Sequence, residues 1–227
     1  GTNGFMIYPT MGSQQLDIER ALNTQTYEDP LPVKPQKFYS AAFRRKDNLL
    51  DLEFFQSVPV KVSQAAEPPE AKVALYDRSL NELARDSSVS VAAPSPDGDL
   101  WLAVNSLPVL PADYSFGLSV ALPEVRSAVK GNLHVESISG RNLSLSGIVM
   151  GVNAEVGQSA YSRGTVKILP RPSLEFGLDE LVETFLEVYN LRSGRNGRRE
   201  YEVRATVVLM AQDRNQVGKL LEQFRVL

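Results

Sequence analysis

Two glutamates in one predicted strand are the first candidates for chemistry. Glu183 and Glu187 are four residues apart, which places them on one face of a strand, about 13 Å apart along it. A retaining glycosidase holds its two carboxyl groups about 5 Å apart, and an inverting one about 6.5–9.5 Å. The spacing therefore favours an ion pair between Glu187 and a base on a neighbouring strand, such as Arg204, over catalysis.

Other catalytic and metal-binding chemistries find little support. His134 is the only histidine and cannot form a histidine-rich metal site by itself; the stretch GNLHVES predicts a half-exposed strand histidine. The absence of cysteine excludes disulfides and thiolate chemistry, and there is no G-x-S-x-G motif. The acidic turn around Gly98 lacks the ligand spacing of an EF-hand loop. We predict no metal, no cofactor and no enzymatic activity.

A basic, glycine-rich segment is the first candidate binding surface. The stretch 192–200 (RSGRNGRRE) carries Arg192, Arg195, Arg198 and Arg199. These side chains could contact an anionic polymer or a lipid headgroup, or form an ordinary solvated loop.

Aromatic residues supply the second candidate surface. Trp101, the only tryptophan, could bind a glycan together with Phe55 and Tyr76 if their rings lie exposed on one sheet face. Each ring also fits a hydrophobic core.

Composition narrows the class of protein. The 227 residues carry a net charge of −3, which gives no general attraction to nucleic acid. No apolar run approaches the roughly 20 residues of a membrane helix, so no transmembrane segment is predicted. No signal peptide is visible, but Gly1 could be a scar of tag cleavage, and a targeting segment or lipid anchor could have been trimmed away.

Period-two alternation predicts the strands that position these residues. In 49–60, Leu50, Leu52 and Phe54 share one face and Asp51 and Glu53 the other, which predicts a half-buried strand. Further strands are predicted at 71–76, 83–93, 100–107, 114–122, 131–138, 142–151 and 164–169.

The C-terminal part predicts a long hairpin. Its outgoing strand, 181–191, is apolar on both faces, with Phe185 on one and Leu186 on the other, and its return strand is 201–210. A strand that is apolar on both faces is usually covered on both.

A tyrosine near the middle of the chain predicts a structural tie. Tyr114 follows Leu110, Pro111 and Ala112, as in the tyrosine corner of immunoglobulin-like sandwiches, whose hydroxyl bonds to upstream backbone.

Frequent short strands and turn signals predict an all-β protein with one or two immunoglobulin-like antiparallel β-sandwiches. We expect an extended, partly helical segment at 1–36, with a helix at 14–22, then one sandwich at 37–139 and a second at 140–227. A turn at 139–142 marks the boundary, and 216–224 could be a helix or an irregular strand.

Several stretches, in order, resemble a known family. They are LPADYSFGLSV (110–120), LSLSGIVM (143–150), Arg163 with Gly164, KILPRP (167–172), FLEVYNL (185–191) and the strand 201–208. This order is similar to the C-terminal β-rich region of bacterial GWxTD domain-containing proteins, although the Gly-Trp-x-Thr-Asp motif is absent. The resemblance implies an exported or envelope-associated protein, periplasmic or a lipoprotein, with no established reaction.

Three functions are compatible with the sequence. The favoured one is a non-catalytic, extracytoplasmic structural or interaction protein of the bacterial envelope, whose partner is another envelope protein or a glycan. The alternative is a carbohydrate-binding or accessory module of a larger secreted protein. The third and least favoured is a carboxylate-based hydrolase, which would need two acids brought together by the fold.

Overall fold

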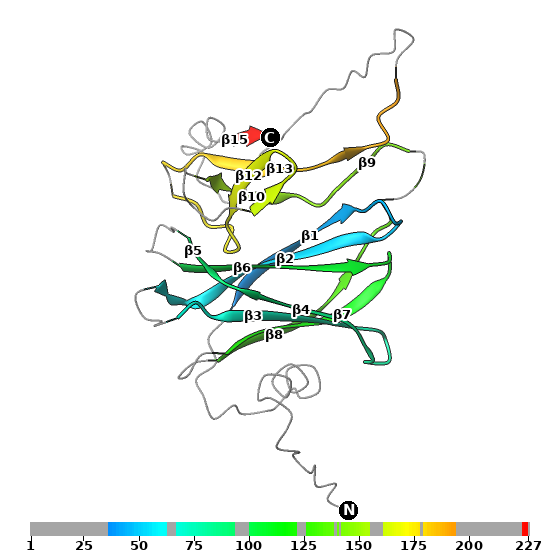
Figure 1. Cartoon of the computed structure of the whole chain (residues 1–227). Coiled ribbons are helices and arrows are strands. Elements are labelled where there is room, and N and C mark those ends of the chain that lie inside the picture. The colour runs from blue at the N-terminus through cyan, green and yellow to red at the C-terminus, as the bar shows by residue number, and fades with distance from the viewer. Residues whose placement is uncertain are drawn as a thin grey trace, which may run out of the picture.

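A computed structural model describes residues 36–62, 67–93, 100–121, 126–138, 140, 142–154, 161–177, 179–193 and 224–226. This part of the chain is all-β and contains fifteen strands, arranged in three layers (Figure 1). The predicted all-β class is therefore confirmed. Several predicted segments lie outside the described residues: the N-terminal helix, the acidic turn at 97–99 and the return strand 201–210. Of the segment 216–224, only Phe224 is described, and it belongs to a strand.

Two four-stranded antiparallel sheets form a β-sandwich. The first has the order β1 (Lys37–Arg44), β2 (Leu50–Lys61), β6 (Leu100–Val109) and β5 (Val91–Ala93). The second has the order β4 (Glu82–Val89), β3 (Glu70–Tyr76), β7 (Asp113–Ala121) and β8 (Arg126–His134). Phe54, Leu75, Leu107 and Leu118 fill the core between them.

A third sheet covers the outer face of the first. Its order is β11 (Tyr161–Arg163), β12 (Val166–Pro170), β10 (Val149–Asn153), β13 (Val182–Phe185) and β15 (Phe224–Val226), with β13 and β15 parallel. A short pair, β9 (Ser144–Leu145) with β14 (Val188–Tyr189), extends beside it. Every strand of the two sandwich sheets precedes residue 139, and every other strand follows residue 142; the division into separate domains stays a prediction.

The strand β2 is buried on both faces, which corrects the prediction of a half-buried strand. Side chains alternate along a strand, so Phe54 enters the sandwich core while Phe55 packs with Phe43, Ile168 and Phe185 under the third sheet. Both rings of β2 are fully buried. The face that also carries Glu53 is therefore an interface between layers.

A buried polar chain joins the two sheets of the sandwich. Gln36 donates through its side chain to Gln56 at 2.6 Å, and Gln56 donates to Asn105 at 2.7 Å. Asn105 donates in turn to Asp86 on β4 at 3.1 Å and to the carbonyl of Ala71 at 3.3 Å. Because buried amides are costly when unpaired, this chain also specifies how the sheets face one another.

The predicted tie at Tyr114 is confirmed. Its hydroxyl donates to the carbonyl of Leu110 at 2.7 Å, across the corner where the chain leaves β6 in one sheet and enters β7 in the other. The bond holds the crossing between the two layers of the sandwich.

The outgoing strand of the predicted C-terminal hairpin is not continuous. Val182–Phe185 pairs with β10 and β15, whereas Val188–Tyr189 pairs with β9. The strands β10 and β15 occupy the two edges of β13. Phe185 is buried and Leu186 is half-buried, so the predicted burial holds fully for Phe185 only.

We expect Tyr114→Phe to lower the free energy of unfolding by about 1 kcal/mol or somewhat more, because the Leu110 carbonyl loses its partner while the ring is kept. Urea denaturation of the parent and variant measures the change, and an unchanged near-ultraviolet circular dichroism spectrum shows that the fold is retained. Equal midpoints would show that the hydroxyl does not hold the corner.

Candidate functional site

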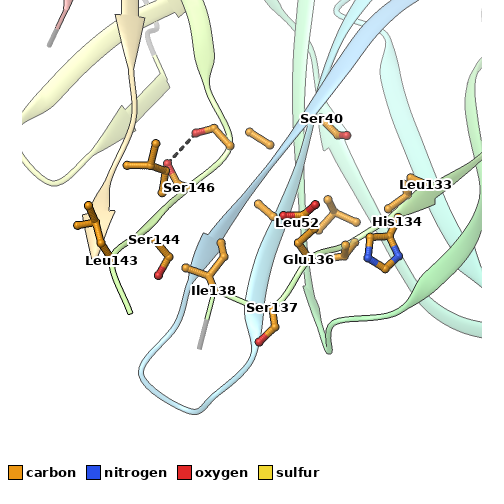
Figure 2. Close-up of a pocket in the computed structure, with 15 residues that line it drawn as sticks. Ser40, Leu52, Leu133, His134, Glu136, Ser137, Ile138, Leu143, Ser144 and Ser146 are labelled. Carbon is orange, nitrogen blue, oxygen red and sulfur yellow. Dashed lines mark hydrogen bonds between the residues drawn. The ribbon is translucent and has the colours of Figure 1, made fainter. Parts of the chain in front are cut away.

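A groove of about 560 Å³ runs along the outer edge of β1. Its walls come from Ser40–Ala42 of β1, from the end of β8 and the segment that follows it, and from residues 143–147. In Figure 2, Leu143 and Ser144 lie on one side of β1, and Leu133 and His134 on the other. The groove is thus built from the first sheet, the second sheet and the chain that leads into the third.

The backbone of β1 presents hydrogen-bonding groups towards this groove. In the hairpin joining β1 to β2, Arg45 N donates to Leu49 O at 2.9 Å, which marks a hydrogen-bonded pair. Such pairs alternate along an antiparallel ladder, so Phe38, Ser40 and Ala42 direct their N–H and C=O groups away from β2.

Two hydrogen bonds verify this alternation. Gly147 N donates to Ala42 O at 2.9 Å, and Arg44 N donates to the Tyr189 hydroxyl at 3.0 Å. No backbone partner is found for Ser40 on this edge within the described part of the chain.

The rim of the groove is apolar and exposed. Leu143 and Leu145 line it and are 64% and 55% exposed, and Ile148 beside them is 51% exposed. Gly147 closes one end, where an added Cβ would lie 2.7 Å from the Cα of Ala41. Only a glycine lets the chain approach β1 so closely.

The charged groups at the groove are few. Glu136 is the only carboxylate among its lining residues and is exposed. His134, also a lining residue, is exposed at the end of β8, and its Nδ1 lies 2.6 Å from Asp113, which Arg78 also contacts at 2.5 Å. The hydrogen bond with His134, followed by that with Arg78, holds the pKa of Asp113 below its usual range. The strand placement predicted for His134 is confirmed.

A second constellation lies between the first and third sheets, centred on Arg163 at the end of β11. Its guanidinium donates to Glu187 at 2.5 Å and to Glu53 at 3.1 Å, and it lies 3.4 Å from Asp51. The same group stacks over the Phe43 ring at 4.3 Å. Glu187 also accepts a hydrogen bond from Tyr189 at 2.5 Å.

Burial dominates the electrostatics of Glu53, whose side chain is 7% exposed. Loss of solvation raises its pKa, and the Tyr161 hydroxyl and Arg163 oppose that rise. Neither Glu53 Oε2 nor the Tyr161 hydroxyl has a hydrogen bond of normal geometry in the described residues. We infer that these two groups are close enough to interact but poorly aligned.

The arrangement around Arg163 resembles a clamp more than a catalytic site. A hydrolase needs two carboxyls facing a substrate, but here one cation bridges Glu53 and Glu187. Neither glutamate lines the groove. The chemistry this arrangement supports is charge neutralisation between two sheets.

Among the described residues, the aromatic side chains predicted to bind a ligand are buried. Trp101 is 7% exposed and packs with Val58 and Val120 in the sandwich core, so it presents no ring for a ligand. The other two aromatic candidates, Phe55 and Tyr76, are buried as well. This burial corrects the placing of Trp101 on a ligand surface.

The basic segment is described only at its start. Arg192 is exposed beyond β14, and Arg195, Arg198 and Arg199 lie outside the described residues. Glu187 forms an ion pair with a basic residue, as predicted, and that residue is Arg163. The predicted partner, Arg204, lies outside the described residues.

Sequence reasoning did not identify the groove or the role of Arg163. One signal was available: Phe55 shares a strand face with Asp51 and Glu53, and a large ring on an otherwise acidic face suggests that the face is covered. For β1, the stretch Ser40–Ala42 has little strand propensity, which hid the strand that forms the groove.

Comparisons of the chain with models of protein families, curated sequences and solved structures found no match. In the part of the chain that the structure describes, no group of three or more histidine or acidic side chains is arranged to hold a metal ion. The same residues include no helix long and apolar enough to cross a membrane.

We expect Arg163→Met to lower the free energy of unfolding by about 3–5 kcal/mol, because the buried carboxylate of Glu53 loses its cation. Lys37→Met is a matched control, since its ion pair with Glu175 is exposed; such pairs contribute about 0–1 kcal/mol. Urea denaturation compares the two variants with the parent. Equal losses of unfolding free energy in the two variants would contradict the neutralisation of a buried carboxylate by Arg163.

We expect Glu53→Gln to change the pH dependence of stability. Because the folded-state pKa of Glu53 is raised, the folded protein retains this proton after the unfolded chain has lost it. The stability of the parent relative to the variant should therefore be highest below about pH 4.3, the ordinary pKa of glutamate, and fall as the pH rises through the folded-state pKa. Urea titrations between about pH 3.5 and 8 test this; a relative stability that rises with pH would show that Arg163 outweighs burial.

Proposed function

We propose that this chain is a non-catalytic interaction module of the bacterial cell envelope. The observation that carries the proposal is the groove beside β1, where a sheet edge and three exposed apolar side chains, Leu143, Leu145 and Ile148, lie together. Exposed apolar side chains that gather around a concave surface favour a protein contact.

The non-catalytic character is supported by how the ionisable groups are used. Arg163 neutralises Glu53 and Glu187 within the interface between sheets. Asp113 is held by His134 and Arg78 at the surface. In these contacts the charges of Glu53, Glu187 and Asp113 are matched by cations or hydrogen-bond partners of the chain itself.

No specific observation supports the two alternative functions, a carbohydrate-binding module and a carboxylate hydrolase. A carbohydrate-binding module needs exposed aromatic rings, and the three candidate rings are buried in cores. A carboxylate hydrolase needs acids that face a cavity, and the acids beside Arg163 do not line the groove.

The envelope location is supported by the resemblance to GWxTD domain-containing proteins, carried by stretches such as LSLSGIVM and FLEVYNL. An immunoglobulin-like sandwich is supported by the two facing four-stranded sheets and the Tyr114 hydroxyl bond at the crossing between them. The full reading frame would test the location: a signal peptide with a lipobox cysteine would support a lipoprotein, and a frame that begins without any export signal would oppose it.

Envelope fractions of the source bacterium provide the test of the interaction. The parent, Leu145→Asp and Leu83→Asp proteins are each cross-linked to the fraction and their captured partners quantified by mass spectrometry. The two leucines are matched, at 55% and 56% exposed, but Leu83 lies on β4, away from the groove. We expect one partner to be lost about tenfold with Leu145→Asp and kept with Leu83→Asp. Equal capture by all three proteins would contradict the proposal.

A further inference from the structure

We propose that the outer edge of β1 binds an extended segment of a partner protein by β-strand addition, with a basic side chain of that segment beside Glu136. This inference rests on the proposed function and names the chemistry of the partner. Strand addition uses main-chain hydrogen bonds for affinity and side-chain pockets for specificity. The groove offers both.

The main-chain component comes from the ladder position of Ser40. Its N–H and C=O point away from β2 towards the groove, as do those of Phe38. Two residues further along β1, Ala42 O already accepts a hydrogen bond from Gly147 N at 2.9 Å. The chain itself therefore uses this edge as a strand partner would, and a bound segment would continue the same row of bonds at Ser40.

The edge of β1 is also less protected than the sandwich edges at β4 and β5. Proteins shield free edges with short strands or charged side chains. The strand β5 has only three residues, and β4 carries Glu82, Arg85 and Asp86. By contrast, β1 has eight residues, and its charges stand only at its ends.

The side-chain component fixes the chemistry of the segment. Leu133, Leu143 and Leu145 line the groove and offer contacts for small apolar side chains that alternate along a strand. Glu136 is the only carboxylate in the lining. Charge complementarity therefore favours a lysine or arginine in the segment at this point.

A proline substitution can remove the main-chain component alone. Because Ser40 N–H takes no part in the ladder with β2, Ser40→Pro deletes an outward donor and no internal bond, and proline is tolerated on edge strands. Ser87 provides the matched control on β4. Ser90 N donates to Pro69 O, so Ser90 directs its N–H towards β3. Because this direction alternates along the antiparallel pair of β3 and β4, the N–H of Ser87 points away from β3, towards solvent.

The probe is a library of random twelve-residue peptides displayed on phage, selected on the parent protein. The selected peptides are then synthesised, and their affinities are measured by calorimetry for the parent, Ser40→Pro, Ser87→Pro and Glu136→Gln. We expect alternating sequences with a basic residue, an affinity at least about tenfold lower for Ser40→Pro, no change for Ser87→Pro and a several-fold loss for Glu136→Gln. Peptides methylated on one or the other set of alternate backbone nitrogens keep the test valid if Ser40→Pro fails to fold: methylation of the set that faces β1 should abolish binding to the parent, and methylation of the other set should be tolerated.

The outcomes separate this inference from the proposed function. Peptides that bind equally to the parent and Ser40→Pro, or that tolerate methylation on both sets of alternate nitrogens, would overturn strand addition at β1 and leave an interaction module with another binding surface. Failure to select any peptide would overturn the inference, while the capture experiment with Leu145→Asp would still decide the proposed function. Self-association of the parent in sedimentation, abolished in Ser40→Pro, would replace the partner protein with a second copy of the chain.

Discussion

The pairing of Arg163 with Glu53 is the constraint that allows the third sheet to cover the sandwich. Phe43, Phe55, Val149, Ile168 and Phe185 are buried between the two sheets, and each contributes about 1.5–3 kcal/mol on burial. The same contact buries the carboxylate of Glu53, whose desolvation costs several kcal/mol when uncompensated. Arg163, which lies within 3.1 Å of Glu53 and stacks on the Phe43 ring, offsets part of this cost.

An irregularity in the third layer delivers a second carboxylate to Arg163 and also forms the groove. Leu145 lies opposite Val188, and Val149 lies opposite Phe185. The chain therefore advances four residues from Leu145 to Val149 but only three from Phe185 to Val188, so the first segment contains one extra residue. Such an extra residue bends a strand and redirects side chains. Here Glu187 is directed to Arg163, while Gly147 reaches the edge of β1. The ionic clamp and the groove therefore arise from the same local geometry.

The sequence reveals the strands better than the way the layers pack. Alternation located β2, β3, β6 and β7, and the turn before Tyr114 predicted a hydroxyl bond that the structure contains. The burial of both faces of β2 was not predictable from alternation, because its outer face is covered by residues more than 90 positions away, such as Tyr161, whose ring contacts Phe55. The same holds for Arg163, which is 110 residues from Glu53. The break at Leu186 was missed because an apolar run does not show where a strand changes partners.

The exposure of the β1 edge follows from how the chain covers the rest of the sandwich. After β8 the chain crosses the open side, where Val135 and Ile138 enter the sandwich core, and it then returns to β1 at Gly147. On the described part of this edge, that return gives Ala42 a partner in Gly147, and Tyr189 of β14 gives one to Arg44. Covering Ser40 in the same way would require the segment to continue beside β1, but Val149–Gly151 is already paired with β13 in the third sheet. Because Val149–Gly151 can pair with only one of these strands, building the third layer leaves Ser40 without a backbone partner in the described part of the chain, and such a sheet edge beside exposed leucines is suited to a partner.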